Sequence, residues 1–224
     1  TLTNLKDNPD NVFATMNPLL QGDPSRNLTF SNGNTTITGG AATWHPCGST
    51  IAAPAKTGKW YWEFSQFVST QIFVGLMASN ANINRNLPYQ TPGLIQYFYA
   101  GRLTVDNSDT ENYFTAISAQ TDVVGVALDM TAGTYGQVQF YLNGSTTGAA
   151  VALTSNFADQ FVMPFAMVNG TSRSISINTG NGYFGTTAVS TNSGNGYAGA
   201  EGASKFNYAV PSGYSALNTK GLNT

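Results

Sequence analysis

Residues 123–144, VVGVALDMTAGTYGQVQFYLNG, decide the fold, because they predict two β-strands joined by a turn. Apolar side chains recur at every second position of both strands: Val124, Val126, Leu128, Val138, Phe140 and Leu142. A period of two with β-branched and aromatic residues is typical of strands that bury one face. Asp129 ends the first strand and Asn143-Gly144 ends the second, and both favour tight turns. We therefore expect a hairpin with one face in a core.

The predicted partner of this hairpin lies upstream at Gly58–Phe64, GKWYWEF. Trp60, Trp62 and Phe64 share one face of this strand, and the alternate residues, which include Glu63, share the other. The three large apolar side chains match the hairpin's apolar face. We expect the three strands to form the centre of one sheet, with these aromatic rings in the interior.

Short strands separated by turns recur about every 8–12 residues through the rest of the chain, which is typical of a β-sandwich. The further predicted strands are Leu28–Ser31, Thr35–Thr38, Ser49–Ala53, Gln71–Met77, Leu94–Tyr99, Gly101–Val105, Ala149–Leu153, Phe161–Val168 and Ser172–Asn178. No segment has a convincing helical period. The sequence therefore predicts an all-β fold, a two-sheet antiparallel β-sandwich.

We expect residues 1–224 to form a single domain with distinct end segments. Residues 1–21 are predicted to be an extended N-terminal arm, because their Asn-Pro pairs disfavour helix. Residues 184–224 contain a Gly- and Asn-rich excursion, followed by a closing segment with enough apolar residues to pack back on the sandwich.

The N-terminal arm carries apolar side chains that a free arm would not need: Val12, Phe13, Met16 and Leu19. An extended arm can add to a sheet edge or fill a groove on a neighbouring protein. Two interpretations remain open, one in which the arm packs on its own sandwich and one in which it mediates assembly. We hypothesise that the arm does not pack only on its own domain, which makes these four residues a candidate assembly site.

Composition excludes several classes of function. Charged residues make up 9% of the chain, against about 25% in typical soluble proteins, while hydrophobic residues make up 41%, so a sizeable core with an uncharged polar surface is expected. The few basic residues are scattered, which argues against nucleic-acid binding. No apolar run is long enough for membrane insertion, and no signal-peptide pattern follows Thr1. Cys47 is the only cysteine, so no intrachain disulfide can form.

No pattern of side chains predicts catalysis or a cofactor. His45 and Cys47 are sequence neighbours around a proline, and Cys47 is interpreted as a small core residue. Glycoside hydrolysis needs two carboxylates flanking one bond, and no predicted strand carries two. The sequence G-x-G-x-x-G occurs at 180–185 and again at 194–199, but neither copy precedes a helical pattern, so both are interpreted as turns.

One acidic turn leaves an alternative open. Asp106, Asp109 and Glu111 offer oxygen ligands of the kind that Ca²⁺ prefers. Their spacing does not match an EF-hand loop, and we expect a solvated turn and no metal site.

Several motifs together resemble a known family. They are GKWYWEF at 58–64, VGL at 74–76, VVGVALDM at 123–130, FYLNG at 140–144 and the PF…ISIN run from Pro164 to Asn178. Their order and spacing resemble those of a SPRY domain over roughly residues 43–183, which implies a concanavalin A-like sandwich. The flanks NVFATMNPL at 11–19 and FNYAVPSGYSALNTKGL at 206–222 resemble SPRY-containing proteins of bacteriophages. Thr121 and Asn178-Thr179-Gly180 depart from the family's usual Gly and Asn-Phe-Gly.

The resemblance implies a non-catalytic structural or binding protein on the surface of a virion, such as a fibre, spike or capsid-decoration component. Its partners would be other virion proteins, in a homo-oligomer or in a capsid or tail lattice. The alternative is a lectin-like module that binds a glycan or protein of the host surface. A glycan hydrolase is the interpretation that the residues favour least.

The resemblance to SPRY domains implies that partners are held by loops at one end of the sheets, where a rigid scaffold positions them. The longest predicted loop is Ser79–Thr91, and the hairpin Leu94–Val105 follows it. Tyrosine and arginine dominate binding hot spots. The candidate binding residues of these two segments are Arg85, Tyr89, Tyr97, Tyr99 and Arg102. The alternative is that Tyr97 and Tyr99 line the sheet and Arg85 is solvated.

Overall fold

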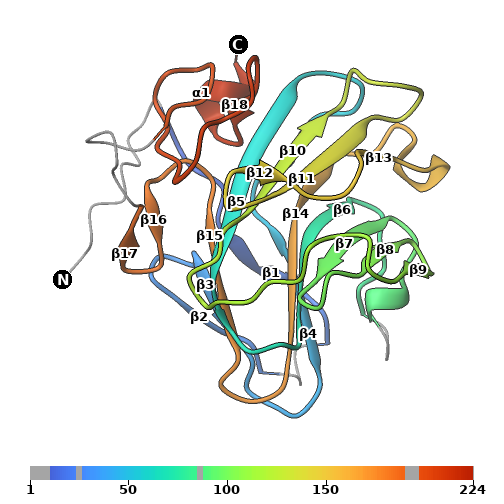
Figure 1. Ribbon diagram of the computed structural model, residues 1–224, viewed down its shortest axis with the longest axis vertical. Coiled ribbons are helices and arrows are strands. Elements are labelled where there is room, and N and C mark those ends of the chain that lie inside the picture. Colours follow the sequence, from blue (N-terminus) through green and yellow to red (C-terminus); the bar gives the residue numbers. More distant parts are fainter. Residues whose placement is uncertain (1–10, 24–26, 85–87, 190–196, 224) are drawn as a thin grey trace.

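Two β-sheets packed face to face make up the fold (Figure 1) in a computed structural model that describes residues 11–23, 27–84, 88–189 and 197–223. Their strands are antiparallel except for the short strand Ser215–Ala216, which runs parallel to its neighbour. The 7-stranded sheet has the order β1 (Met16–Gln21), β4 (Trp44–Ser49), β14 (Val162–Asn169), β6 (Ile72–Ala78), β7 (Leu94–Phe98), β8 (Leu103–Val105) and β9 (Ser108–Thr110). The 9-stranded sheet has the order β12 (Ser145–Thr146), β11 (Gln137–Leu142), β10 (Val124–Asp129), β5 (Lys59–Val68), β15 (Ser174–Asn178), β3 (Thr36–Thr38) and β2 (Thr29–Ser31), and includes β13 (Val151–Ala152) beside β11 and β18 (Ser215–Ala216) beside β5.

Short elements complete the chain. They are the hairpin of β16 (Tyr183–Phe184) and β17 (Thr187–Ala188), the 3₁₀ turns η2 (Pro88–Gln90) and η3 (Ser155–Phe157), and the helix α1 (Thr219–Leu222). In the described part of the chain, no helix has the length and hydropathy needed to cross a bilayer.

The hairpin and its partner strand lie where the sequence predicts them. In the central register, Val126 is opposite Phe140 on one side and opposite Trp62 on the other. All nine predicted inward side chains face the space between the sheets, with Leu142 half-buried at its margin: Trp60, Trp62, Phe64, Val124, Val126, Leu128, Val138, Phe140 and Leu142. The predicted all-β sandwich is confirmed.

The outer faces of both sheets are also covered. On the 7-stranded sheet, Phe73 and Met77 point away from the interior and pack with Ile83 of the long loop after β6. On the 9-stranded sheet, Tyr61 points outward and packs edge-on against Phe206 of the C-terminal segment, with ring centroids 4.9 Å apart. The central strands are therefore buried on both faces.

The N-terminal segment differs from the assembly arm that the sequence suggests. Residues 16–21 form the edge strand β1 on β4, and Phe13 and Met16 are buried in the chain's own fold. These two side chains therefore follow the first interpretation, in which the arm packs on its own sandwich. Val12 and Leu19 do face solvent, and Leu19 is 94% exposed.

The strand β4 is not predicted by the sequence. Its residues Trp44–Ser49 contain Pro46 and Gly48, which favour a loop, and the sequence predicts a strand later, at Ser49–Ala53. The segment is a strand because β14 pairs with it on one side and β1 on the other. Pairing with segments distant in sequence overrides the local loop signals.

Candidate functional site

Loops from both sheets gather at one end of the sandwich. The backbone N–H of Ala53 donates to Val162 O at 2.7 Å, which joins the loop before β5 to the start of β14. The N–H of Ser79 donates to Phe161 O at 2.8 Å, which joins the loop after β6 to the same point. Segments from three different connections therefore meet there.

Asp106 holds this end together. Its Oδ1 accepts the backbone N–H of Gly93 at 2.6 Å, and its Oδ2 accepts the Thr154 hydroxyl at 2.9 Å. One carboxylate thus connects the β8–β9 turn to the loop after β6 and to the loop before β14. Asp109 and Glu111, the other candidate Ca²⁺ ligands, are directed instead to Arg102, at 3.3 and 3.5 Å. Asp106 and the Asp109–Glu111 pair therefore serve different partners.

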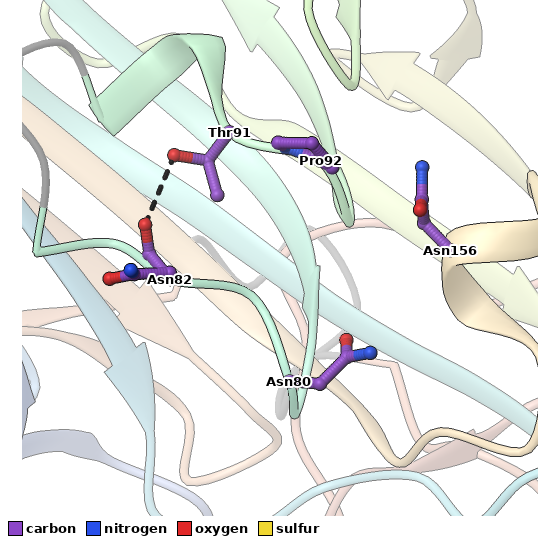
Figure 2. A pocket seen from close by; sticks show the side chains of 5 residues that line it. All are labelled: Asn80, Asn82, Thr91, Pro92 and Asn156. Atoms are coloured by element: carbon purple, nitrogen blue, oxygen red, sulfur yellow. Dashed lines mark hydrogen bonds between the residues drawn. The ribbon is translucent and has the colours of Figure 1, made fainter.

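An uncharged hollow lies between two of these loops, and we call it the asparagine hollow. It encloses about 260 Å³ and is lined by Asn80, Asn82, Thr91, Pro92 and Asn156. Figure 2 shows Asn82 and Thr91 on one side of it and Asn80 and Asn156 on the other. The Thr91 hydroxyl donates to Asn82 O at 3.3 Å, which braces one wall. The described lining residues carry no charge.

A second feature lies on the outer face of the 7-stranded sheet, and we call it the aromatic–arginine platform. It consists of Trp44, Phe73, Tyr89, Phe98 and Arg102. The fully buried Phe73 ring is its centre, and the Tyr89 ring stacks on it at 5.7 Å with an interplanar angle of 6°. The guanidinium carbon of Arg102 lies 4.8 Å from the Phe98 ring centroid and 5.4 Å from that of Phe73. Arginine over aromatic faces is a favourable contact.

The predicted binding residues separate into three groups. Tyr89 and Arg102 both contact Phe73 and are half-buried on the platform. Tyr97 is fully buried between the sheets, where its hydroxyl donates to Thr115 O, so it lines the sheet as the alternative interpretation has it. Tyr99 is half-buried and packs against Phe67. Arg85 lies outside the described residues.

The alternation of side chains along β7 explains why Tyr97 is buried between the sheets. In β7, Ile95 and Tyr97 face the interior, whereas Leu94 and Phe98 belong to the outer face. Successive side chains of a strand point to opposite faces. Val74 and Leu76 of the neighbouring β6 also point inward, and they pair with Tyr97 and Ile95. The alternation along β7 is therefore the sequence signal that places Phe98, and not Tyr97, on the outer face.

Glu63 is a buried polar centre that the sequence did not reveal. Its carboxylate accepts the N–H groups of Asn207 at 2.8 Å and Tyr208 at 3.0 Å, both from the C-terminal segment. It also accepts the Tyr61 hydroxyl at 3.2 Å and the Asn178 amide at 3.3 Å. Burial raises the pKa of Glu63 to about 7, although these four donors act in the opposite direction. The geometry anchors the C-terminal segment to β5.

The neighbouring pair His45 and Cys47 lacks the properties of a catalytic pair. Both side chains are fully buried. Burial raises the pKa of the Cys47 thiol to about 12, so the nucleophilic thiolate is absent at neutral pH. The His45 Nε2 is hydrogen-bonded to Ala41 O at 2.8 Å. Cys47 behaves as the small core residue that the sequence suggests.

Solved structures share this architecture. The SPRY domain of human HERC1 matches with a TM-score of 0.56 and 18% identity, over 72% of this chain and 96% of that domain. Another human SPRY domain matches with a TM-score of 0.53 and 14% identity, over 67% of this chain and 93% of that one. Stonustoxin matches with a TM-score of 0.53 and 18% identity, over 74% of this chain and 27% of the stonustoxin chain.

Sequence comparison identifies the family directly. A search of curated proteins finds no match. The SPRY domain family matches residues 59–182, which is more than half of the chain and includes both the central hairpin and its partner strand. The chain therefore belongs to the SPRY domain family.

Proposed function

We propose that this SPRY domain is a non-catalytic structural and binding component of a virion surface, and that it contacts another virion protein through the aromatic–arginine platform. SPRY domains are binding modules, so a partner is expected. The platform carries the proposal, because it combines half-buried tyrosine, tryptophan and arginine side chains packed on the outer face of the 7-stranded sheet. These residue types are enriched at protein interfaces and their hot spots.

The virion context rests on the two flanks that resemble bacteriophage proteins. In the fold these flanks lie against each other: Ala14 N–H donates to Leu217 O at 3.2 Å, and Thr219 N–H donates to Val12 O at 3.0 Å. The segments that carry the resemblance are therefore integral to the domain.

The test is binding of the Tyr89→Ala and Arg102→Ala variants to the other proteins of purified virions, measured by cross-linking or co-sedimentation. Loss of a hot-spot side chain costs about 2 kcal/mol or more, so affinity should fall by roughly tenfold or more. Matched controls are Tyr197→Ala, which removes a 40% exposed tyrosine elsewhere, and Arg173→Ala, which removes an arginine bonded to Ser69. Unchanged binding in both platform variants, with folded protein, would reject the platform.

The lectin-like alternative is favoured by a different observation, the uncharged asparagine hollow. The platform lies on the outer face of a sheet and the hollow lies between loops at its end. One chain can therefore use both surfaces, and binding to host cells would be tested separately from binding to virion proteins.

A further inference from the structure

We infer that the asparagine hollow is a binding site for one neutral sugar ring, held by the side-chain carboxamides of Asn80 and Asn156. This inference rests on the glycan-binding alternative above and names its ligand. It is independent of the platform, because none of the residues that line the hollow belongs to the platform.

The first argument is hydrogen-bonding capacity. Within the described part of the chain, neither the Asn80 nor the Asn156 carboxamide is bonded to another residue, and Figure 2 shows both on one side of the hollow. Each carboxamide offers an acceptor oxygen and two donor hydrogens. A pair of neighbouring sugar hydroxyls presents the matching donor and acceptor, so each amide can make two bonds to one ring.

The second argument is charge. The described lining residues are three asparagines, a threonine and a proline. A phosphate or carboxylate ligand would lose its hydration without gaining a cation, and a metal ion would find no carboxylate. The hollow therefore suits an uncharged ligand rich in hydroxyl groups.

The third argument is size and shape. A volume of about 260 Å³ lies just below the range of about 300–1,000 Å³ that holds drug-sized ligands, and it suits a single ring. Strand addition, one recurring mode of peptide recognition, needs an unpaired strand edge, whereas the walls of this hollow are loops. Phe161, whose backbone oxygen accepts the N–H of Ser79 next to Asn80, is 57% exposed at the same end of the sandwich.

The fourth argument is preorganisation. Asp106 joins the two loops that carry Asn80 and Asn156, through its bonds to Gly93 and Thr154. Loops held in place before binding lose less conformational entropy when a ligand arrives.

The experiment is an NMR titration of the whole protein with methyl glycosides of glucose, galactose, mannose and N-acetylglucosamine. We expect at least one of them to shift the side-chain amide signals of Asn80 and Asn156, with a Kd on the order of millimolar. The double variant Asn80→Ala/Asn156→Ala should weaken that binding by roughly tenfold or more. The control Gln120→Ala removes an exposed carboxamide beside the far end of β5, where Phe67 N–H bonds Gln120 O, and should bind as the wild type does.

A neutral capped peptide is titrated in parallel. Three outcomes would overturn the inference: no shift with any glycoside, equal binding by the wild type and the double variant, or shifts caused by the peptide and by no glycoside. If the double variant fails to fold, the wild-type titration still decides, because the signals of Asn80 and Asn156 report the site directly. Tyr89→Ala should leave sugar binding unchanged, so failure of this site and failure of the virion contact are distinguishable.

Discussion

At the scale of single residues, Glu63 is a fully buried side chain whose carboxylate oxygens are both hydrogen-bonded. The side chain is fully buried on the outer face of β5, and each carboxylate oxygen accepts two hydrogen bonds. Two of the donors are backbone N–H groups of the C-terminal segment, from Asn207 and Tyr208. The carboxylate therefore accepts backbone hydrogen bonds of the kind that the carbonyl groups of a neighbouring strand accept in a sheet.

Glu63 gives the fold a defined pH dependence. Burial raises its pKa from 4.5 to about 7, so the folded chain holds this proton more tightly than the unfolded chain does. Its contribution to the free energy of unfolding is therefore fully present below pH 4.5 and is lost as the pH rises through 7. The shift corresponds to a decrease of roughly 3 kcal/mol across this window.

Urea denaturation at several pH values between 4 and 8 measures this slope. In Glu63→Gln the titrating group is absent, so the slope across this window should flatten even though the lost acceptor lowers stability overall. An equal slope in the wild type and in Glu63→Gln would show that another group is responsible.

At the scale of elements, the β10–β11 hairpin contributes a row of buried side chains to the core. Phe140 is fully buried on β11, and its ring lies 5.1 Å from Phe114 and 5.9 Å from Tyr97. These two rings come from a long connection and from the other sheet. The hairpin therefore supplies one wall of the interior, and distant segments fill the space against it.

Truncation of Phe140 should be costly. We expect Phe140→Ala to lower the free energy of unfolding by about 3–5 kcal/mol, because it removes a ring from a closely packed core and leaves a cavity. The matched control is Phe161→Ala, which removes a 57% exposed ring and should change stability by about 0.5 kcal/mol or less. Chemical denaturation measures both, and a loss of less than about 1 kcal/mol at Phe140 would contradict the face assignment.

At the scale of the whole molecule, the N-terminal segment joins the two sheets. β1 extends the 7-stranded sheet by pairing with β4, while Met16 N–H donates to Asn34 O before β3 of the other sheet. The Thr179 hydroxyl donates to Ala14 O at 2.6 Å. Removal of this segment would therefore expose the core of its own domain.

The buried and the exposed residues of the candidate assembly site should differ in how far their mutation lowers the free energy of unfolding. Met16→Ala should lower the free energy of unfolding by about 2–5 kcal/mol, because the side chain is buried. Leu19→Ala should change it by about 0.5 kcal/mol or less, because Leu19 is 94% exposed. Thermal or urea unfolding measures both, and a large loss at Leu19 would show that its exposed side chain is nonetheless structural.

Assembly through this segment stays a prediction that concerns Val12 and Leu19 alone. A Val12→Ser/Leu19→Ser variant should dissociate any homo-oligomer or reduce incorporation into virions while the fold is retained. Analytical ultracentrifugation and virion composition measure these outcomes. Wild-type assembly by the variant would remove the N-terminal segment from the proposed interface.

The sequence by itself determined the sandwich and the inward face of its central strands. That information is local, because alternation along β5, β10 and β11 specifies which side chains share a face, and the turn residues specify where each strand ends. Tertiary structure alone decided that the Trp44–Ser49 segment is a strand, that Glu63 is buried, and that Asn80 and Asn156 share one hollow. Each of these depends on segments far apart in the chain, which supply a pairing edge, a cover or an opposite wall, and no local pattern records such a neighbour.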